Sequence, residues 1–235
     1  MEKVRFEAAG GIGRILLDDG KVNAMDGEFF TELNLALDRA EGEGVRALVV
    51  RGREGFFSAG LNVKLLPSLG PKELDGLVDA FARTILRVFT FPCPTVAACT
   101  GHAIAGGALL AFACDLRFML DGPFKVQMNE VAAGLALPSW ALLVAQTAIP
   151  PRRHAELLLH ARACSPGQAV QWGLFAGAPA TPEALDEAAS GAARELLALD
   201  GTAYGETKLR MRAEVVERVL ALLPSERPNR LPFRG

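Results

Sequence analysis

Apolar residues in the first half of the chain form short runs that are typical of β-strands. Residues 4 to 17 predict two strands that meet as a hairpin around Gly10-Gly11, because paired glycines suit a tight reversal. Residues 45 to 51 (VRALVVR) and 95 to 99 (TVAAC) are mostly apolar, as expected for buried parallel strands. The pattern predicts a mainly parallel sheet that follows a hairpin.

Other segments repeat apolar residues at helical spacing. Asp26 is placed to cap one helix and Pro71 to open a second, and a third is expected from Gly106 to Ala113. The apolar positions of the first two helices are Phe29, Leu33, Ala36, Leu37 and Ala40, then Leu74, Leu77, Val78, Phe81, Ile85 and Val88. Strands alternating with helices are the signature of right-handed βαβ crossovers, which predicts an α/β fold.

After about residue 150 strand signals become rare and helical stretches follow. Ser165-Pro166 and Thr181-Pro182 are cap-plus-first-residue starts, and a last helix is expected from near Tyr204 to Leu223, ending at Pro224. We therefore expect a core over residues 1–150 and a helical C-terminal region over 151–235, within one continuous domain.

Composition narrows the function. The chain has 235 residues, half of them apolar, which suits one large domain, and a net charge of −2 with a pI near 6.0. Neither nucleic acid nor an anionic membrane surface is an expected partner. The N-terminus lacks the apolar run of a signal peptide, no stretch is long enough to span a bilayer, and the four cysteines form no CxxC pair. These features predict a cytoplasmic protein with reduced, buried thiols.

Two glycine-containing loops predict a pocket for a developing negative charge. They are FFSAGLNVK (residues 56–64) and GHAIAGGALLAFACD (residues 101–115), where Gly106 opens a helix. Glycine lets backbone N–H groups approach an anion, and a helix N-terminus favours one. Either loop alone is ordinary turn chemistry. Glu130 lies in a separate apolar stretch, where a raised pKa would suit a general base, although an isolated glutamate is more often a surface carboxylate.

Six segments in this order resemble the crotonase family, the enoyl-CoA hydratase/isomerase superfamily. They are KVNAMD (21–26), FFSAGLNVK, GHAIAGGALLAFACD, NEVAAGLALP (129–138), SPGQAVQWGLF (165–175) and Thr207-Lys208. The resemblance implies a spiral of ββα units with a helical C-terminal segment. It also implies that the N–H groups of Leu61 and Gly106 bind a thioester oxygen.

The resemblance implies further substrate contacts. Residues 61 to 64 are expected to line the CoA channel, and the family often has Asp where this chain has Asn62, which bears on the adenine contacts. Lys21 and Lys64 are candidates for the CoA phosphates. The predicted substrate-binding residues are Leu61, Asn62, Val63, Lys64, Leu65, Gly106, Leu135 and Trp140. Five apolar residues are expected to form either an acyl pocket or part of the core: Leu61, Leu65, Leu66, Leu135 and Trp140.

The resemblance also bears on the reaction. Hydratases of the family hold water between two glutamates, of which the second matches Glu130, while the first is replaced by Leu109. Relatives that move a double bond likewise have an apolar residue there, an Asn-Glu pair, and a Gly-Leu-x-x-Pro-x-Trp pattern like that of residues 134–140. Isomerisation of a 3-enoyl-CoA to 2-trans-enoyl-CoA through a dienolate needs only one base, Glu130. The alternatives are a hydratase, another CoA-thioester activity such as a thioesterase, or a CoA-ligand-binding protein without turnover.

The same resemblance implies a homotrimer or hexamer built by the helical C-terminal region. CoA is expected only as part of the substrate thioester, with no other cofactor and no metal. Several polar residues are interpreted as structural instead. His102 and Asp115 are expected to be packing residues, Ser58 lacks His and Asp partners at the spacing of a triad, and residues 152–154 (Arg-Arg-His) are expected at a solvated helix start.

Overall fold

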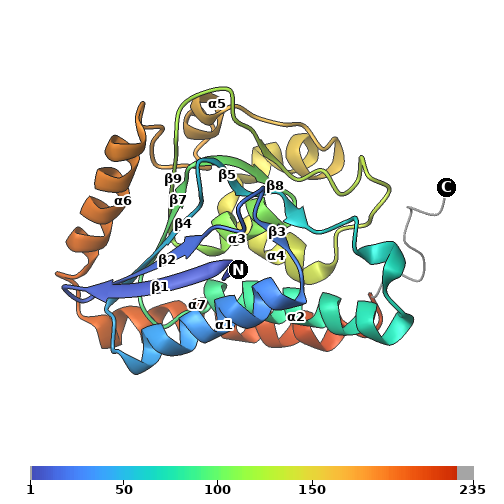
Figure 1. The fold of residues 1–235 in the computed structure, drawn as a ribbon, viewed down its shortest axis with the longest axis horizontal. Coiled ribbons are helices and arrows are strands. Elements are labelled where there is room, and N and C mark those ends of the chain that lie inside the picture. The colour runs from blue at the N-terminus through green and yellow to red at the C-terminus, as the bar shows by residue number, and fades with distance from the viewer. Residues whose placement is uncertain (1, 227–235) are drawn as a thin grey trace.

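The computed structural model describes residues 2–226 and contains two main sheets (Figure 1). Five strands form the larger sheet in the order β1-β2-β4-β7-β9, and three form the smaller sheet in the order β10-β8-β5. A two-stranded ladder pairs β3 with β6. The bounds are β1 Val4–Ala9, β2 Ile12–Leu17, β3 Ala24–Met25, β4 Ala47–Arg51, β5 Gly55–Ser58, β6 Gly60–Leu61, β7 Thr95–Cys99, β8 Gly101–Ile104, β9 Leu116–Met119 and β10 Val126–Gln127.

The predicted hairpin and parallel sheet are confirmed. β1 and β2 pair antiparallel with Ala9 opposite Ile12, and both glycines of the turn have positive φ. β2, β4, β7 and β9 pair in parallel. All five residues of β7 and four of the five in β4 are buried, because helices cover both faces of the sheet there.

A repeated ββα unit explains how two sheets form from one chain. In each unit the first strand joins the larger sheet, the second joins the smaller sheet, and a helix follows. The units are β4-β5-α2, β7-β8-α3 and β9-β10-α4, with α2 at Pro71–Phe89, α3 at Gly106–Ala113 and α4 at Ser139–Ala148. The expected spiral of ββα units is therefore present.

The main core lies between the larger sheet and helices α1 to α4. Helix α1 (Gly27–Gly42) begins as predicted, since the Asp26 carboxylate accepts the Phe29 N–H at 3.0 Å. The five apolar positions predicted for this helix are buried, as are most of those in α2. Figure 1 shows α1 and α2 side by side along the lower edge, with α7 (Gly201–Leu222) behind them.

Helix α6 (Pro182–Leu196) covers the opposite face of the larger sheet, at the left of Figure 1. Its residues Leu185, Ala189 and Ala193 pack on β4, β7 and β9 as a second, smaller core. A cavity of about 650 Å³ opens beside it, between α6 and strands β1, β2 and β4, and includes the ion pair of Arg51 with Asp186. This cavity shares no residue with the predicted site.

The helical character of the C-terminal region is confirmed up to residue 226. Ser165 and Thr181 cap α5 (Pro166–Gln171) and α6 as predicted. Helix α7 begins three residues before Tyr204, because Asp200 accepts the Ala203 N–H at 2.7 Å and serves as its cap. The remaining residues assigned to this region, 227–235, lie outside the described part of the chain.

Two further observations concern the chain as a whole. All four cysteines are free thiols in buried positions, as expected, and burial raises the pKa of Cys164 to about 11. Within residues 2–226, no helix is both long and apolar enough to cross a membrane. The same residues contain no group of three or more His, Cys, Asp or Glu side chains that suits a metal ion.

Candidate active site

The first predicted loop begins at a distortion in the smaller sheet. The register between β5 and β8 shifts between Phe56 and Ser58, so the strand bends just before the loop. The Ser58 hydroxyl donates to the Asn23 carbonyl at 2.7 Å and accepts the Gly60 N–H at 3.1 Å. Beyond Gly60, whose φ is +82°, Leu61 pairs with Met25 in the β3-β6 ladder. Hydrogen bonds on both sides therefore hold the backbone at Leu61.

The second predicted loop lies directly against the first. A Cβ built on Gly60 would come within 2.9 Å of the Gly106 nitrogen and 2.9 Å of the Ile104 carbonyl oxygen. A Cβ built on Gly107 would come within 2.1 Å of the Ser58 carbonyl oxygen. Such distances leave room for hydrogen only, so glycine is required at both positions. The two segments that were predicted to form one pocket are thus brought together.

Helix α3 begins at this contact with a strained backbone. Ala105, the residue before its first turn, has φ +50° and ψ −119°, a conformation that non-glycine residues rarely adopt and that costs on the order of 1–3 kcal/mol. No side chain caps the helix. The N–H of Gly106, its first residue, has no carbonyl one turn earlier within the helix, so the dipole and this N–H favour an anion there. Strain of this kind is found at functional sites.

Glu130 reaches the same region through the smaller sheet. Strand β10 pairs in parallel with β8, and the Ala105 N–H donates to the Gln127 carbonyl at 2.8 Å. Glu130 follows Gln127 by three residues. The Glu130 carbonyl accepts N–H groups from Ala133 at 3.0 Å and Leu135 at 2.8 Å, which fixes its backbone in a turn. The turn that carries the carboxylate therefore starts next to the N-terminus of α3.

The Glu130 carboxyl group is largely desolvated. Its Oε2 is buried and has no hydrogen-bond partner among the described residues. Burial raises the pKa of Glu130 from 4.5 to about 7. A carboxyl group with that pKa is present in both protonation states near neutral pH, and can both take and return a proton.

Apolar side chains surround the start of α3. Leu109 lies on α3, is 1% exposed and belongs to the main core, so the position holds no second carboxylate. Trp140, on α4, is also buried, and its ring packs edge-on against Phe81 at 4.9 Å between centroids. The Phe81 ring would lie 2.8 Å from a Cβ built on Gly106. Trp140 is thus linked to Gly106 through one intervening ring, and its buried Nε1 has no partner in residues 2–226.

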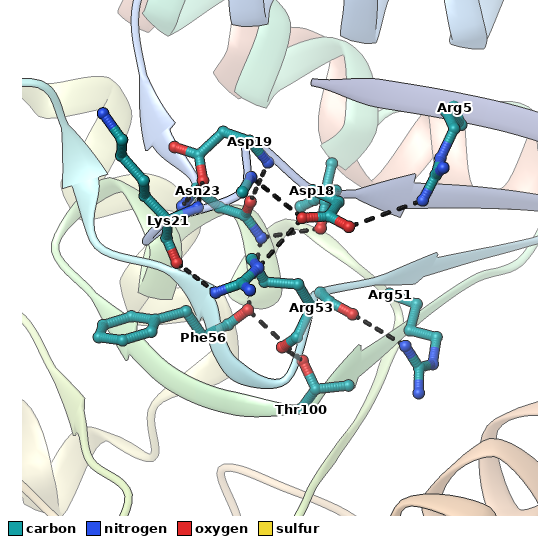
Figure 2. Close-up of polar contacts among 12 residues, drawn as sticks. Arg5, Asp18, Asp19, Lys21, Asn23, Arg51, Arg53, Phe56 and Thr100 are labelled. Carbon is teal, nitrogen blue, oxygen red and sulfur yellow. Dashed lines mark hydrogen bonds and ion pairs between the residues drawn. The ribbon is translucent and has the colours of Figure 1, made fainter. Parts of the chain in front are cut away.

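The other predicted substrate-binding residues differ in exposure. Val63 and Lys64 are exposed, whereas Leu61, Asn62, Leu65 and Leu135 are partly buried. The Asn62 N–H donates to the Met25 carbonyl at 2.8 Å, so this segment lies along β3. Lys21 is exposed on the loop before β3, and its amino group points away from the polar network in Figure 2. Lys21 and Lys64 are therefore both accessible to solvent.

A buried asparagine that the sequence analysis did not single out holds the first loop in place. Asn23 has φ +52°, is fully buried, and donates through Nδ2 to the carbonyls of Leu17 at 2.9 Å and Phe57 at 3.0 Å. Asp19 accepts the Asn23 N–H at 2.8 Å. Figure 2 shows this cluster continuing through Arg53, whose Nε donates to Asp18 at 3.0 Å. The sequence Asp-Asp-Gly before Asn23 is typical of a turn and is the signal that could have drawn attention to this residue.

Two of the residues interpreted as structural, His102 and Asp115, make the packing contacts expected of them. Asp115 pairs with Lys208 at 2.6 Å and with Arg212 at 3.0 Å. The His102 ring lies between Phe56 and Phe124, at centroid distances of 5.1 and 5.5 Å.

The expectation of a solvated Arg-Arg-His segment at residues 152–154 is wrong for two of its members. Arg152 is exposed, but the Arg153 guanidinium stacks 4.3 Å over Trp172 and pairs with Glu156 at 2.6 Å. His154 Nε2 lies 2.8 Å from the Ile149 carbonyl oxygen. For Arg153 the cause is tertiary, because Trp172, just after α5, places its ring against this turn.

The spiral of ββα units, the two glycine loops in contact and the helical C-terminal region define a crotonase fold. The family model for enoyl-CoA hydratase/isomerase matches residues 7–226. The chain belongs to this family.

Relatives within the family include proteins named as hydratases and proteins named as isomerases. A putative enoyl-CoA hydratase of Thermus thermophilus is 33% identical over 205 residues, covering 86% of this chain and 78% of that protein. The crystal structure of an enoyl-CoA hydratase from Mycobacterium marinum matches with a TM-score of 0.88 and 32% identity, covering 96% of this chain and 100% of that one. Human mitochondrial Δ3-Δ2-enoyl-CoA isomerase matches with a TM-score of 0.89 and 26% identity, covering 95% and 88%. These similarities establish the family but do not distinguish a hydratase from an isomerase.

Proposed function

We propose that this protein converts 3-enoyl-CoA to 2-trans-enoyl-CoA. The Glu130 carboxylate removes a proton from C2, the carbon next to the thioester carbonyl. The electron pair delocalises to the thioester oxygen, giving a dienolate. The same carboxyl group then returns the proton to C4 as the double bond forms between C2 and C3. No atom is gained or lost, so one acid-base group suffices.

The N–H groups of Leu61 and Gly106 are proposed to stabilise the dienolate. The support is the contact between the two glycine loops and the uncapped start of α3. Two N–H donors held by the fold need no reorganisation as charge develops, and losing one such donor typically costs about 10²–10³ in rate. In a complex, both nitrogens should lie about 2.7–3.1 Å from the thioester oxygen.

The observation that carries the choice of isomerase is the pairing of one desolvated carboxyl group, that of Glu130, with an apolar side chain at Leu109. Glu130 has a pKa near 7, and Leu109 occupies the position where hydratases of the family have their first glutamate. Hydration requires a base for the water and a proton source for C2, and an apolar side chain supplies neither.

The substrate is proposed to bind as a CoA thioester with no additional cofactor. Residues 61–64 would line the channel for the pantetheine arm, with Lys21 and Lys64 toward the phosphates. Leu65, Leu135 and Trp140 would form the wall of the acyl pocket. The protein is further proposed to form a homotrimer or hexamer, for which the exposed Leu209 and Met211 on α7 provide apolar surface.

Separate incubations with 3-enoyl-CoA and with 2-enoyl-CoA test the proposal. The expected result is conjugated 2-enoyl-CoA from the first, seen as a gain in thioester absorbance, and little 3-hydroxyacyl-CoA from the second. Efficient hydration of 2-enoyl-CoA would identify a hydratase instead. Release of free CoA from either would identify a thioesterase.

A further inference from the structure

A carboxylate from the end of the chain caps the helix that follows the Glu130 turn. Glu226, which lies just beyond α7, accepts the Ser139 N–H through Oε2 at 2.7 Å. Its Oε1 accepts the Ser139 hydroxyl group in a very short hydrogen bond. Ser139 is the first residue of α4, and the preceding cap residue, Pro138, has no side chain that can accept a hydrogen bond. The cap is therefore supplied across 87 positions of sequence by a charged group.

The capped residue lies next to two members of the candidate site. Trp140 follows Ser139 directly and packs against Phe81. On the other side, residues 130–138 connect Glu130 to the start of α4. The backbone is fixed at the Glu130 end, because the Glu130 carbonyl accepts the Leu135 N–H. Glu226 provides the anchor at the far end. The segment that bears the proposed base is thus held at one end by its own turn and at the other by Glu226.

The position of Glu226 is itself fixed. Its N–H donates to the carbonyls of Leu222 at 3.2 Å and Leu223 at 3.3 Å, so the carboxylate is carried on a continuation of α7. Helix α7 packs on α4 and is tied to the core through the pair of Lys208 with Asp115. In addition to this packing between the helices, the Glu226 side chain links the end of α7 to the start of α4.

We propose that Glu226 is a positioning residue for the reaction. It holds the start of α4 so that the 130–138 segment keeps Oε2 of Glu130 buried and Trp140 in place. This inference rests on the proposed function of Glu130. A group that only stabilised the fold would alter the amount of folded protein. A positioning group also alters kcat and the pH at which Glu130 titrates, because a looser segment admits water to its carboxyl group.

Four variants test this role. Glu226→Ala removes both acceptor oxygens, whereas Glu226→Gln keeps one carbonyl oxygen for the Ser139 N–H. Ser139→Pro removes both donors, and proline suits the first position of a helix. Pro138 already has the extended backbone (φ −70°, ψ 158°) that a residue before proline adopts. The matched control is Glu217→Ala, an exposed carboxylate on α7.

Steady-state kinetics of 3-enoyl-CoA isomerisation across pH give the expected pattern. Glu226→Ala and Ser139→Pro lower kcat by about 10-fold, since small misplacements of a catalytic group are costly. In both variants the midpoint of the pH profile moves from about 7 toward the ordinary range of a glutamate. Glu226→Gln recovers most of kcat, and Glu217→Ala behaves as wild type. Folded Glu226→Ala protein with unchanged kcat and midpoint would overturn the proposal. If Glu226→Ala does not fold, kcat and the midpoint of the pH profile of Ser139→Pro test the proposal instead, and unchanged values would overturn it.

Hydrogen exchange separates failure of this inference from failure of the proposed function. If the wild type isomerises no enoyl-CoA, the function of Glu130 is wrong, and the exchange rates of amides 129–140 still test the anchor. Faster exchange there in Glu226→Ala, but not in Glu217→Ala, supports the anchor. Equal exchange in both variants overturns it.

Discussion

Replacement of Glu130 by glutamine separates the proposed chemistry from the cost of burying the carboxyl group. The amide is nearly the same size and cannot accept the C2 proton. Loss of a general base typically lowers the rate by about 10²–10⁴. We therefore expect kcat for 3-enoyl-CoA to fall within that range, while the affinity for the thioester is kept, because the proposed N–H donors of Leu61 and Gly106 belong to the backbone.

The same substitution should stabilise the fold at alkaline pH. One pKa unit corresponds to about 1.4 kcal/mol, so a rise from 4.5 to about 7 corresponds to at most about 3 kcal/mol. Between these two values the folded protein binds more protons than the unfolded chain, so wild-type stability falls as the pH rises from 4.5 through 7. Glutamine does not titrate. The variant should match the wild type near pH 4.5 and exceed it above pH 7.

Urea unfolding at several pH values, together with isomerase kinetics, measures both effects. The wild-type pH-rate profile should rise with an apparent pKa near 7, because the base must be deprotonated. A Glu130→Gln variant that isomerises at the wild-type rate would refute the role of Glu130. Equal dependence of stability on pH in both proteins would refute the desolvation of its carboxyl group.

Three other substitutions follow from the packing. Gly60→Ala places a Cβ 2.9 Å from the Gly106 nitrogen and should reduce kcat/KM by at least about 10-fold, measured on folded protein. Asp115→Asn leaves the buried Lys208 without its carboxylate and should lower the free energy of unfolding by about 3–5 kcal/mol in urea titrations. Leu109→Glu should raise hydration of 2-enoyl-CoA above the wild-type background, read as 3-hydroxyacyl-CoA formed per folded protein. Because Leu109 is 1% exposed, that variant should also be several kcal/mol less stable, and a stable variant with unchanged hydration would contradict the explanation.

Much of the secondary structure could be predicted because its signals are local. Asp26 and Ser165 each cap a helix through a side chain within three residues, and the apolar spacing after Asp26 marks the buried face. Four of the five strands of the larger sheet have five or six residues, and β4 and β7 are mostly apolar, whereas β9 has four residues. The strands of the smaller sheet have two to four residues and were not predicted, because runs that short carry no periodicity and depend on pairing across the fold.

The site was only partly predictable for the same reason. The two glycine loops and Glu130 were found because motifs carry them, and the structure brings the loops together. Asn23 was missed, since its importance lies in carbonyl groups supplied by β2 and β5. The contact between Glu226 and Ser139 joins segments 87 positions apart and has no local signature. The stacking of Arg153 on Trp172 reversed an interpretation that rested on charge alone.

The central claim is that one carboxyl group moves a proton from C2 to C4 of the acyl chain. Isomerisation of 3-enoyl-CoA deuterated at C2, followed by mass spectrometry of the product, tests it most directly. Because Oε2 of Glu130 is buried, the account predicts that part of the deuterium appears at C4 of 2-enoyl-CoA, and that Glu130→Gln abolishes this transfer. Product that contains only solvent hydrogen at C4, or a 3-hydroxyacyl-CoA as the main product, would contradict the account.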